Sequence, residues 1–215
     1  DNHYCGPING EILDYRAVNI NPEEMERTVG EITGKPYMPY FTDTVVYKSD
    51  ITQSVRDLYL AILEHAPKLE KEETLFFLIE QILREYASDF ESADILQPNP
   101  RIKTLCTYIE EHYAENLTLD DLLAMTDFGK SYLLRSFTKQ TGVSPYRYLQ
   151  TIRLDKARKF LEQGIAPIDA AGMAGFADQS HFTHFFKEFI GLTPKQYQLI
   201  FQNNTEQAET DDDEK

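Results

Sequence analysis

The side chains best suited to binding a ligand are basic, and they gather in one part of the chain. Residues 101–203 hold 12 Lys and Arg against 11 Asp and Glu, whereas residues 1–100 hold 8 against 19. Residues 101–203 therefore contribute little to the net charge of −15, most of which comes from the rest of the chain. Basic residues sharing one face can bind phosphates, although this balance predicts low non-specific affinity for nucleic acid. The candidates are Lys130, Arg135, Lys139, Arg147, Arg153, Lys156, Arg158, Lys159 and Lys187.

Other chemistries find little support in the sequence. Cys5 and Cys106 form neither a CxxC motif nor a disulfide framework, so we expect a reducing cytoplasm. His181 and His184 lie three residues apart, as metal ligands can, but no third ligand is evident. Phosphate-binding glycine loops and nucleophile elbows are absent, and no apolar run reaches the ~18 residues of a membrane helix. We therefore predict a protein that is not an enzyme and holds no cofactor or metal.

The basic segment carries one pattern twice. At an offset of 48 residues, Asp121, Met125 and Phe128 match Asp169, Met173 and Phe176, and the offset then becomes 49 where a turn is expected. The duplicated pattern is a short helix, a tight turn and a second helix, which is the form of a helix-turn-helix. The pairs at offset 49 are Ser131 with Ser180, Phe137 with Phe186, Gly142 with Gly191, Pro145 with Pro194, and Tyr148 with Tyr197.

Capping residues and apolar spacing predict which elements position these side chains. A long helix from Pro145 to about Gln163 connects the two copies, with Ser144 as its cap. Its roughly 19 residues would span about 28 Å, near the ~34 Å between successive major-groove faces. The other helices expected in this segment cover residues 101–116, 118–125, 130–141, 169–174, 179–190 and 194–201.

The first hundred residues predict a different organisation. Leu13–Ile20 and Thr44–Lys48 have the pattern of strands, and helices are expected over residues 51–66 and 70–87. Residues 88–100 are acidic and contain two prolines, so we predict a linker there. Residues 202–215 form an acidic tail, for which we predict disorder. The predicted domains are therefore residues 1–87 and 101–201.

A broad apolar stripe marks the second of those N-terminal helices. It either packs inside the N-terminal domain or forms a subunit interface, and both can hold. Together with the acidity of residues 1–100, the stripe also leaves an alternative function open, a protein-interaction module in which DNA binding is weak. The stripe consists of Leu75, Leu78, Ile79, Ile82, Leu83 and Tyr86.

The duplicated segment resembles the DNA-binding domain of the AraC/XylS family of bacterial transcription regulators. The resemblance covers about residues 101–201, and its most specific part is GFADQSHFTHFFKEFIGLTPKQY, residues 175–197. It implies a mainly α fold, a bipartite seven-helix domain with two helix-turn-helix units that read adjacent major-groove segments of double-stranded DNA. It also implies a regulator in the cytoplasm that works with RNA polymerase as an activator, with a repressor left open as the alternative.

Residues 1–90 resemble, more weakly, the end of that family's effector-binding domain. There a cupin-like β-barrel precedes a helical hairpin that often mediates dimerisation. The resemblance implies a partial cupin-like β segment, a small-molecule effector of unknown identity and a homodimer. Most of the barrel is expected to be absent from this chain.

In the family, exposed positions early in the second helix of each copy reach base edges. The resemblance therefore implies Lys130, Ser131, Leu134 and Arg135 in the first copy, and Gln179, Ser180, His181 and His184 in the second. Arginine can bond guanine with two hydrogen bonds and glutamine can do so with adenine, whereas leucine offers only apolar contact. Lys139 and Lys187 are better suited to phosphates.

The second copy departs from the family pattern. Ala170, Gly172 and Ala174 stand in a helix that usually has larger apolar side chains, and glycine costs ~1 kcal/mol relative to alanine within a helix. We therefore predict a loosely held second copy. His184 also replaces the arginine common among relatives, so we expect the sequence preference of this copy to differ from theirs.

Overall fold

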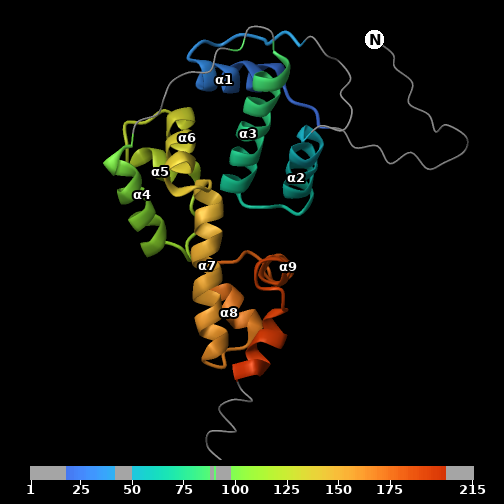
Figure 1. The fold of residues 1–215 in the computed structure, drawn as a ribbon, viewed down its shortest axis with the longest axis vertical. Helices are drawn as coiled ribbons and strands as arrows, with labels where there is room; N and C mark the ends of the chain where they lie inside the picture. Colours follow the sequence, from blue (N-terminus) through green and yellow to red (C-terminus); the bar gives the residue numbers. More distant parts are fainter. Residues whose placement is uncertain (1–17, 42–49, 88–89, 91–97, 202–215) are drawn as a thin grey trace, which may run out of the picture. The chain divides into compact units, whose positions relative to one another are not determined.

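The computed structural model describes residues 18–41, 50–87, 90 and 98–201, and these residues are mainly α-helical (Figure 1). The described residues within 1–66 and 74–92 form an N-terminal unit, and those within 67–73 and 93–215 form a C-terminal unit. Within the described ranges, no helix combines the length and the apolar character needed to cross a membrane.

The predicted cupin-like β segment receives no support. No strand occurs in the described part of the chain, where Phe41 and Ala87 form an isolated bridge. The predicted strand Thr44–Lys48 and residues 13–17 of the other lie outside the described residues, and residues 18–20 are not a strand. Part of the expected barrel segment is instead the start of helix α1 (Pro22–Thr33), which the sequence analysis missed.

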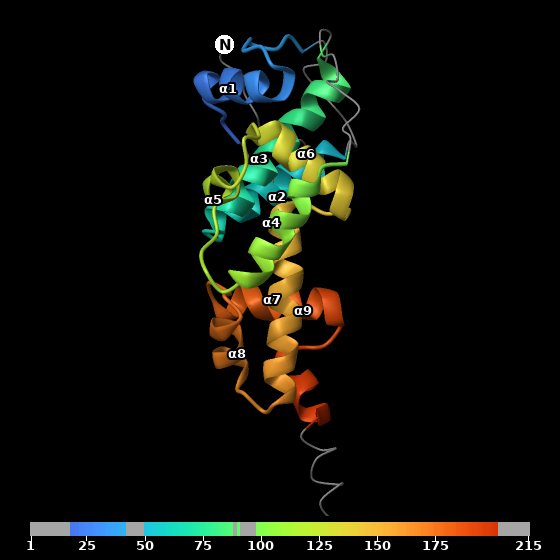
Figure 2. The same ribbon diagram turned by 90° about the vertical axis from the view of Figure 1, so that its left-hand side faces the viewer.

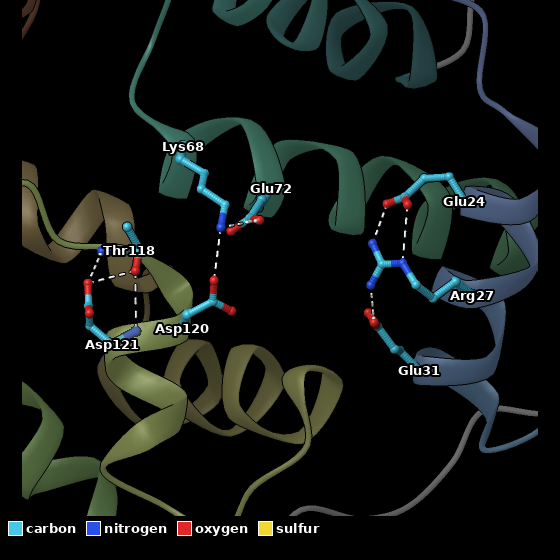
Figure 3. Close-up of polar contacts among 8 residues, drawn as sticks. All are labelled: Glu24, Arg27, Glu31, Lys68, Glu72, Thr118, Asp120 and Asp121. Atoms are coloured by element: carbon cyan, nitrogen blue, oxygen red, sulfur yellow. Dashed lines mark hydrogen bonds and ion pairs between the residues drawn. The ribbon is translucent and has the colours of Figure 1, made fainter.

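Helix α1 has the signals of a capped helix. The Asn21 side chain accepts a hydrogen bond at 2.9 Å from the backbone N–H two residues on, and the helix ends before Gly34. On its exposed side, Arg27 pairs with Glu24 and Glu31, one turn before and one turn after it (Figure 3). These local interactions stabilise a helix in a segment for which the sequence analysis predicted none.

Helices α2 (Ile51–Leu63) and α3 (Lys68–Tyr86) confirm the two helices predicted for this region. The Ser54 hydroxyl donates to the Gln81 amide oxygen at 2.8 Å and so ties the two helices together. Leu78, Ile79 and Leu83 of the apolar stripe are at most 2% exposed. Most of the stripe's surface is therefore already covered in a single chain. The other three members, Leu75, Ile82 and Tyr86, are partly exposed.

The C-terminal unit begins its first helix-turn-helix after helix α4 (Pro100–Glu111). Helix α5 (Leu119–Ala124) starts with a reciprocal cap between Thr118 and Asp121 (Figure 3). The Thr118 N–H donates to the Asp121 carboxylate at 2.8 Å, and hydrogen bonds from Thr118 lower the pKa of that carboxyl. Helix α6 (Lys130–Thr141) follows and ends before Gly142, as the sequence predicts.

Helix α7 (Pro145–Glu162) is the axis of the C-terminal unit. The Ser144 hydroxyl caps it, Pro145 occupies its first turn, and its 18 residues span about 27 Å. Helices α4, α5 and α6 lie along its first half, and α8 (Pro167–Met173) and α9 (Gln179–Ile190) along its second (Figures 1 and 2). Residues 194–201 form a further helix, so residues 98–201 contain the seven helices predicted.

Helix α7 contributes side chains to a separate core in each helix-turn-helix. Leu149 is buried in its first half, where the neighbouring core is rich in leucine. Leu154, Ala157 and Leu161 of the second half pack into the second core. There the small side chains of α8 meet aromatic rings, which lets the helices approach closely. The remaining buried members of that core are Ala170, Ala171, Ala174, Phe176, Phe182, Phe185 and Phe186.

The first turns of α3 belong to the C-terminal unit and place a carboxyl group at the start of α7. Glu73 is 3% exposed, and its Oε1 accepts a hydrogen bond at 2.8 Å from the Tyr146 backbone N–H. Lys68 makes an exposed ion pair with Asp120 at 2.8 Å (Figure 3). Burial raises the pKa of Glu73 to about 8, against hydrogen bonds from residues 144 and 146 that lower it.

Stability should therefore fall as the pH rises through neutrality. An unfolded glutamate ionises near 4.5, so between about 4.5 and 8 the folded chain binds more protons than the unfolded chain. The stabilisation is complete below pH 4.5 and is lost as the pH rises through 8. We expect this site to contribute a loss of about 4 kcal/mol, measured by urea unfolding at pH 5, 7 and 9.

The variant Glu73→Gln should lose this pH-dependent part of the free energy of unfolding. An amide stays neutral at every pH and still accepts a hydrogen bond from the Tyr146 N–H. Glu85→Gln, at an exposed position of the same helix, is the matched control and should keep the wild-type pH profile. A Glu73→Gln protein whose stability declines with pH as steeply as the wild type would show that Glu73 ionises freely.

Two glycines of the second helix-turn-helix should respond oppositely to alanine. Gly172 is exposed within α8 and a Cβ there meets no atom within 4 Å, so Gly172→Ala should raise stability by about 1 kcal/mol. Gly175 has φ +85°, and its Cβ would lie 2.7 Å from the Ala114 Cα and 2.8 Å from the Tyr113 carbonyl oxygen. Gly175→Ala should therefore destabilise the protein, as urea unfolding would measure.

Amide hydrogen exchange in the same variants tests the predicted looseness of the second copy. We expect weaker protection of residues 167–173 than of residues 119–124, and a smaller difference in Gly172→Ala. Equal protection in the wild type would contradict that prediction.

Candidate nucleic-acid interface

The first helix-turn-helix presents α6 through a turn held by its neighbours. The ring of Phe128 packs edge-on to Tyr132 at 4.8 Å between centroids, and the Arg101 guanidinium carbon lies 5.9 Å from the centre of the same Phe128 ring. Arg101 also pairs with Asp127 in the turn. Gly129 is the N-cap of α6 and provides no side-chain cap. Aromatic packing therefore fixes the entry to α6.

Only some of the side chains proposed on α6 face solvent. Lys139 is exposed, and Lys130 and Arg135 are partly exposed. Ser131 is 8% exposed and Leu134 is 0% exposed. The structure does not support a base contact from Leu134, because this side chain lies in the core and has no surface to offer a thymine methyl. Ser131 is similarly enclosed.

Helix α9 exposes a different set of side chains. The Asp178 carboxylate caps it by accepting from the His181 N–H at 2.7 Å. Exposed positions are occupied by Gln179, Ser180, His184 and Lys187. His181 is partly buried, with its ring 6.3 Å from that of Phe176 and 6.4 Å from that of Phe185, so it supports the core as well as the surface.

Three basic residues of α7 contact other groups of the C-terminal unit, and the side chains of Arg147 and Arg158 stay 42% and 41% exposed. Arg147 lies over aromatic rings of α9, and Lys156 lies 4.9 Å from the ring centre of Tyr113. Arg158 pairs with Asp155 and Glu162 on its own helix. Of the basic residues predicted to share one face, Lys139 and Lys187 are exposed on the two second helices, and Lys130 and Arg135 are partly exposed there.

A buried arginine joins the two helix-turn-helix units. Arg153 is 4% exposed, and it donates from Nε to the Tyr113 carbonyl at 2.8 Å and from Nη2 to the Glu115 carbonyl at 2.8 Å. Burial lowers its pKa, because the charge has left water. Gly175 of the second turn lies against the same loop, as its close approach to Tyr113 and Ala114 shows.

Sequence reasoning did not find these joining residues. It counted Arg147 and Arg153 only as basic surface, and treated Gly175 only as part of a motif. The start of α9 could be predicted, because Asp178 is an N-cap residue type directly before the predicted helix. The carbonyl partners of Arg153 lie about forty positions away and leave no local pattern.

Most of the C-terminal unit matches a known family of domains. Residues 122–199 match the model of a family described as a helix-turn-helix domain. The chain is 47% identical over 181 residues to the uncharacterized HTH-type transcriptional regulator YbfI of Bacillus subtilis (strain 168), covering 84% of this chain and 66% of that relative. The chain thus spans only part of that relative's length.

Further similarities cover smaller shares of the chain. The HTH-type transcriptional activator RhaS of Escherichia coli O139:H28 (strain E24377A / ETEC) is 33% identical over 96 residues, covering 44% of this chain and 34% of that protein. Among solved structures, the C-terminal domain of AraT, a response regulator from Geobacillus stearothermophilus, is 28% identical with a TM-score of 0.45. It covers 49% of this chain and 88% of that one.

Proposed function

The chain belongs to the AraC/XylS family of helix-turn-helix transcription regulators, and we propose that it reads two adjacent major-groove segments of one DNA duplex. The observation that carries this proposal is the arrangement of α6 and α9 on the two halves of α7. A connecting helix of about 27 Å is compatible with the ~34 Å between successive major-groove faces.

Within this proposal the two second helices serve as recognition helices with distinct side chains. Arg135 bonds guanine, and Gln179 bonds adenine. Ser180, His181 and His184 contact base edges or phosphates, and Lys130, Lys139 and Lys187 contact phosphates. Ser131 contributes at most through its backbone, because its side chain is enclosed.

Control by the N-terminal unit is the second part of the proposal. We infer an effector-binding or dimerising role for it, with RNA polymerase as a partner on DNA. For dimerisation, Leu75, Ile82 and Tyr86 are the stripe residues that keep exposed surface in one chain. The same burial weakens the alternative of a protein-interaction module, since the wide stripe that favoured it is mostly covered.

A DNA selection with random duplexes at two salt concentrations tests the function. We expect an enriched bipartite motif whose two parts lie about one helical turn apart, and an affinity that falls as salt rises. Enrichment of no motif, together with a steep salt dependence, would leave only non-specific binding.

Variants assign the motif to residues. Arg135→Ala should relax preference at one base pair of one half and Gln179→Ala at one base pair of the other, each by about 1–3 kcal/mol. Lys139→Ala is the control, which should weaken all sequences equally and reduce the salt slope by about 1. Unchanged base preference in both Arg135→Ala and Gln179→Ala would contradict these assignments.

A dimer is tested separately by sedimentation of the chain. Ile82→Glu places a charge on the partly exposed edge of the stripe and should convert a dimer into a monomer, because a buried unpaired charge is costly. Glu85→Lys, at an exposed position of α3, is the control for a charge change there. A wild-type chain that is monomeric at high concentration would refute the dimer.

A further inference from the structure

Arg147 connects the start of α7 to the end of α9. It is the third residue of α7, and its backbone N–H donates to the capping Ser144 hydroxyl at 3.3 Å. Only residues 142–144 separate α7 from α6. The base of this side chain is therefore fixed next to the first recognition helix.

The other end of Arg147 lies on the second recognition helix. Its guanidinium carbon is 4.2 Å from the ring centre of Phe189 and 5.1 Å from that of Phe185. The two rings are themselves 4.5 Å apart with 32° between their planes. An Nη2 atom lies 3.7 Å from the Glu188 carboxylate, which adds an exposed ion pair. A planar guanidinium can stack on such rings, whereas an ammonium group cannot.

The burial of these partners shows that the contact is an addition to the core. Phe185 is 6% exposed and belongs to the second core, whereas Phe189 is 43% exposed. On its own helix the ring packs against Phe185, and the Arg147 guanidinium lies over it. Phe189 therefore extends the core outward to the arginine.

This contact gives α9 a second attachment along α7. The core of the second helix-turn-helix holds α9 beside Leu154, Ala157 and Leu161, which lie in the second half of α7. Arg147 holds it two turns or more earlier, close to α6. The second turn is also held through Gly175 against the loop after α4, so Arg147 adds a contact made by α9 itself and narrows the rotation of α9 relative to α6 that remains.

We propose that Arg147, stacked on Phe185 and Phe189, sets the separation and phase at which the two recognition helices meet DNA. Arg147 is then a positioning residue that determines which half-site spacing is accepted, without contacting a base. This inference rests on the proposed bipartite DNA reading.

The test measures affinity for duplexes in which the two selected half-sites are joined by spacers of different lengths. The wild type should prefer one spacing. Arg147→Ala should lose roughly fivefold in discrimination between spacings, because a cation–π contact of this kind is worth about a factor of five. Base preference within each half-site and the salt slope should stay unchanged. Arg147→Lys should lose less discrimination than Arg147→Ala, since an ammonium group can still lie over one ring but cannot stack on both.

Two further variants keep the test decisive. Phe189→Ala removes the exposed ring with little loss of core and should broaden the spacing preference in the same way. It also serves if Arg147→Ala fails to fold, which thermal unfolding reports. Lys159→Ala removes a charge from an exposed position of α7 and should keep the wild-type spacing preference.

Each outcome separates this inference from the proposed function. Wild-type spacing preference in both Arg147→Ala and Phe189→Ala overturns the positioning role. Equal loss of affinity at every spacing with a reduced salt slope also overturns it, and assigns Arg147 to a phosphate contact. A wild type that selects a motif but accepts every spacing overturns the inference alone, whereas a wild type that selects no motif overturns the proposed function with it.

Discussion

The buried guanidinium of Arg153 is the constraint on which the C-terminal unit depends. A charge removed from water is tolerated only when hydrogen bonds replace its hydration, and here two backbone carbonyls do so. Those carbonyls lie in the loop after α4, so the middle of α7 is fixed to the first helix-turn-helix. Gly175 brings the second turn against the same loop, where any side chain would collide with backbone. The middle of α7, the loop after α4 and the turn before α9 therefore have to move together.

The contacts made by the cations of α7 bear on how a segment with almost no net charge can bind DNA. Several cations of α7 make contacts within the C-terminal unit, Arg147 with aromatic rings, Arg153 with carbonyls and Arg158 with carboxylates. In the proposed binding mode, the side chains that meet phosphate are few and lie on α6 and α9. Binding that relies on few phosphate contacts has to draw more of its affinity from geometry, which raises the value of a fixed relation between α6 and α9.

The helices of this unit could be predicted because their ends carry local signals, such as Ser144 before Pro145 and Gly142 after α6. Signals of the same kind, Asn21 before α1 and Gly34 after it, were present for a helix that was not predicted. Side-chain orientation could not be predicted in this way. Leu134 is buried because α6 is rotated toward its core by packing, and Glu73 meets α7 across 73 positions of sequence.

The two recognition helices are not chemically equivalent, and their difference follows from packing. The leucine-rich first core leaves α6 presenting Lys130, Arg135 and Lys139, all cationic. The aromatic second core draws His181 inward and leaves α9 presenting mostly neutral groups, with Lys187 in its last turn. In the proposed mode of DNA binding, electrostatic attraction, which decays with salt, belongs mainly to α6, and hydrogen bonding by Gln179 and its neighbours works only at contact distance. In that mode α9 contributes once α6 is bound, and α7 has to hold it at the correct place in advance.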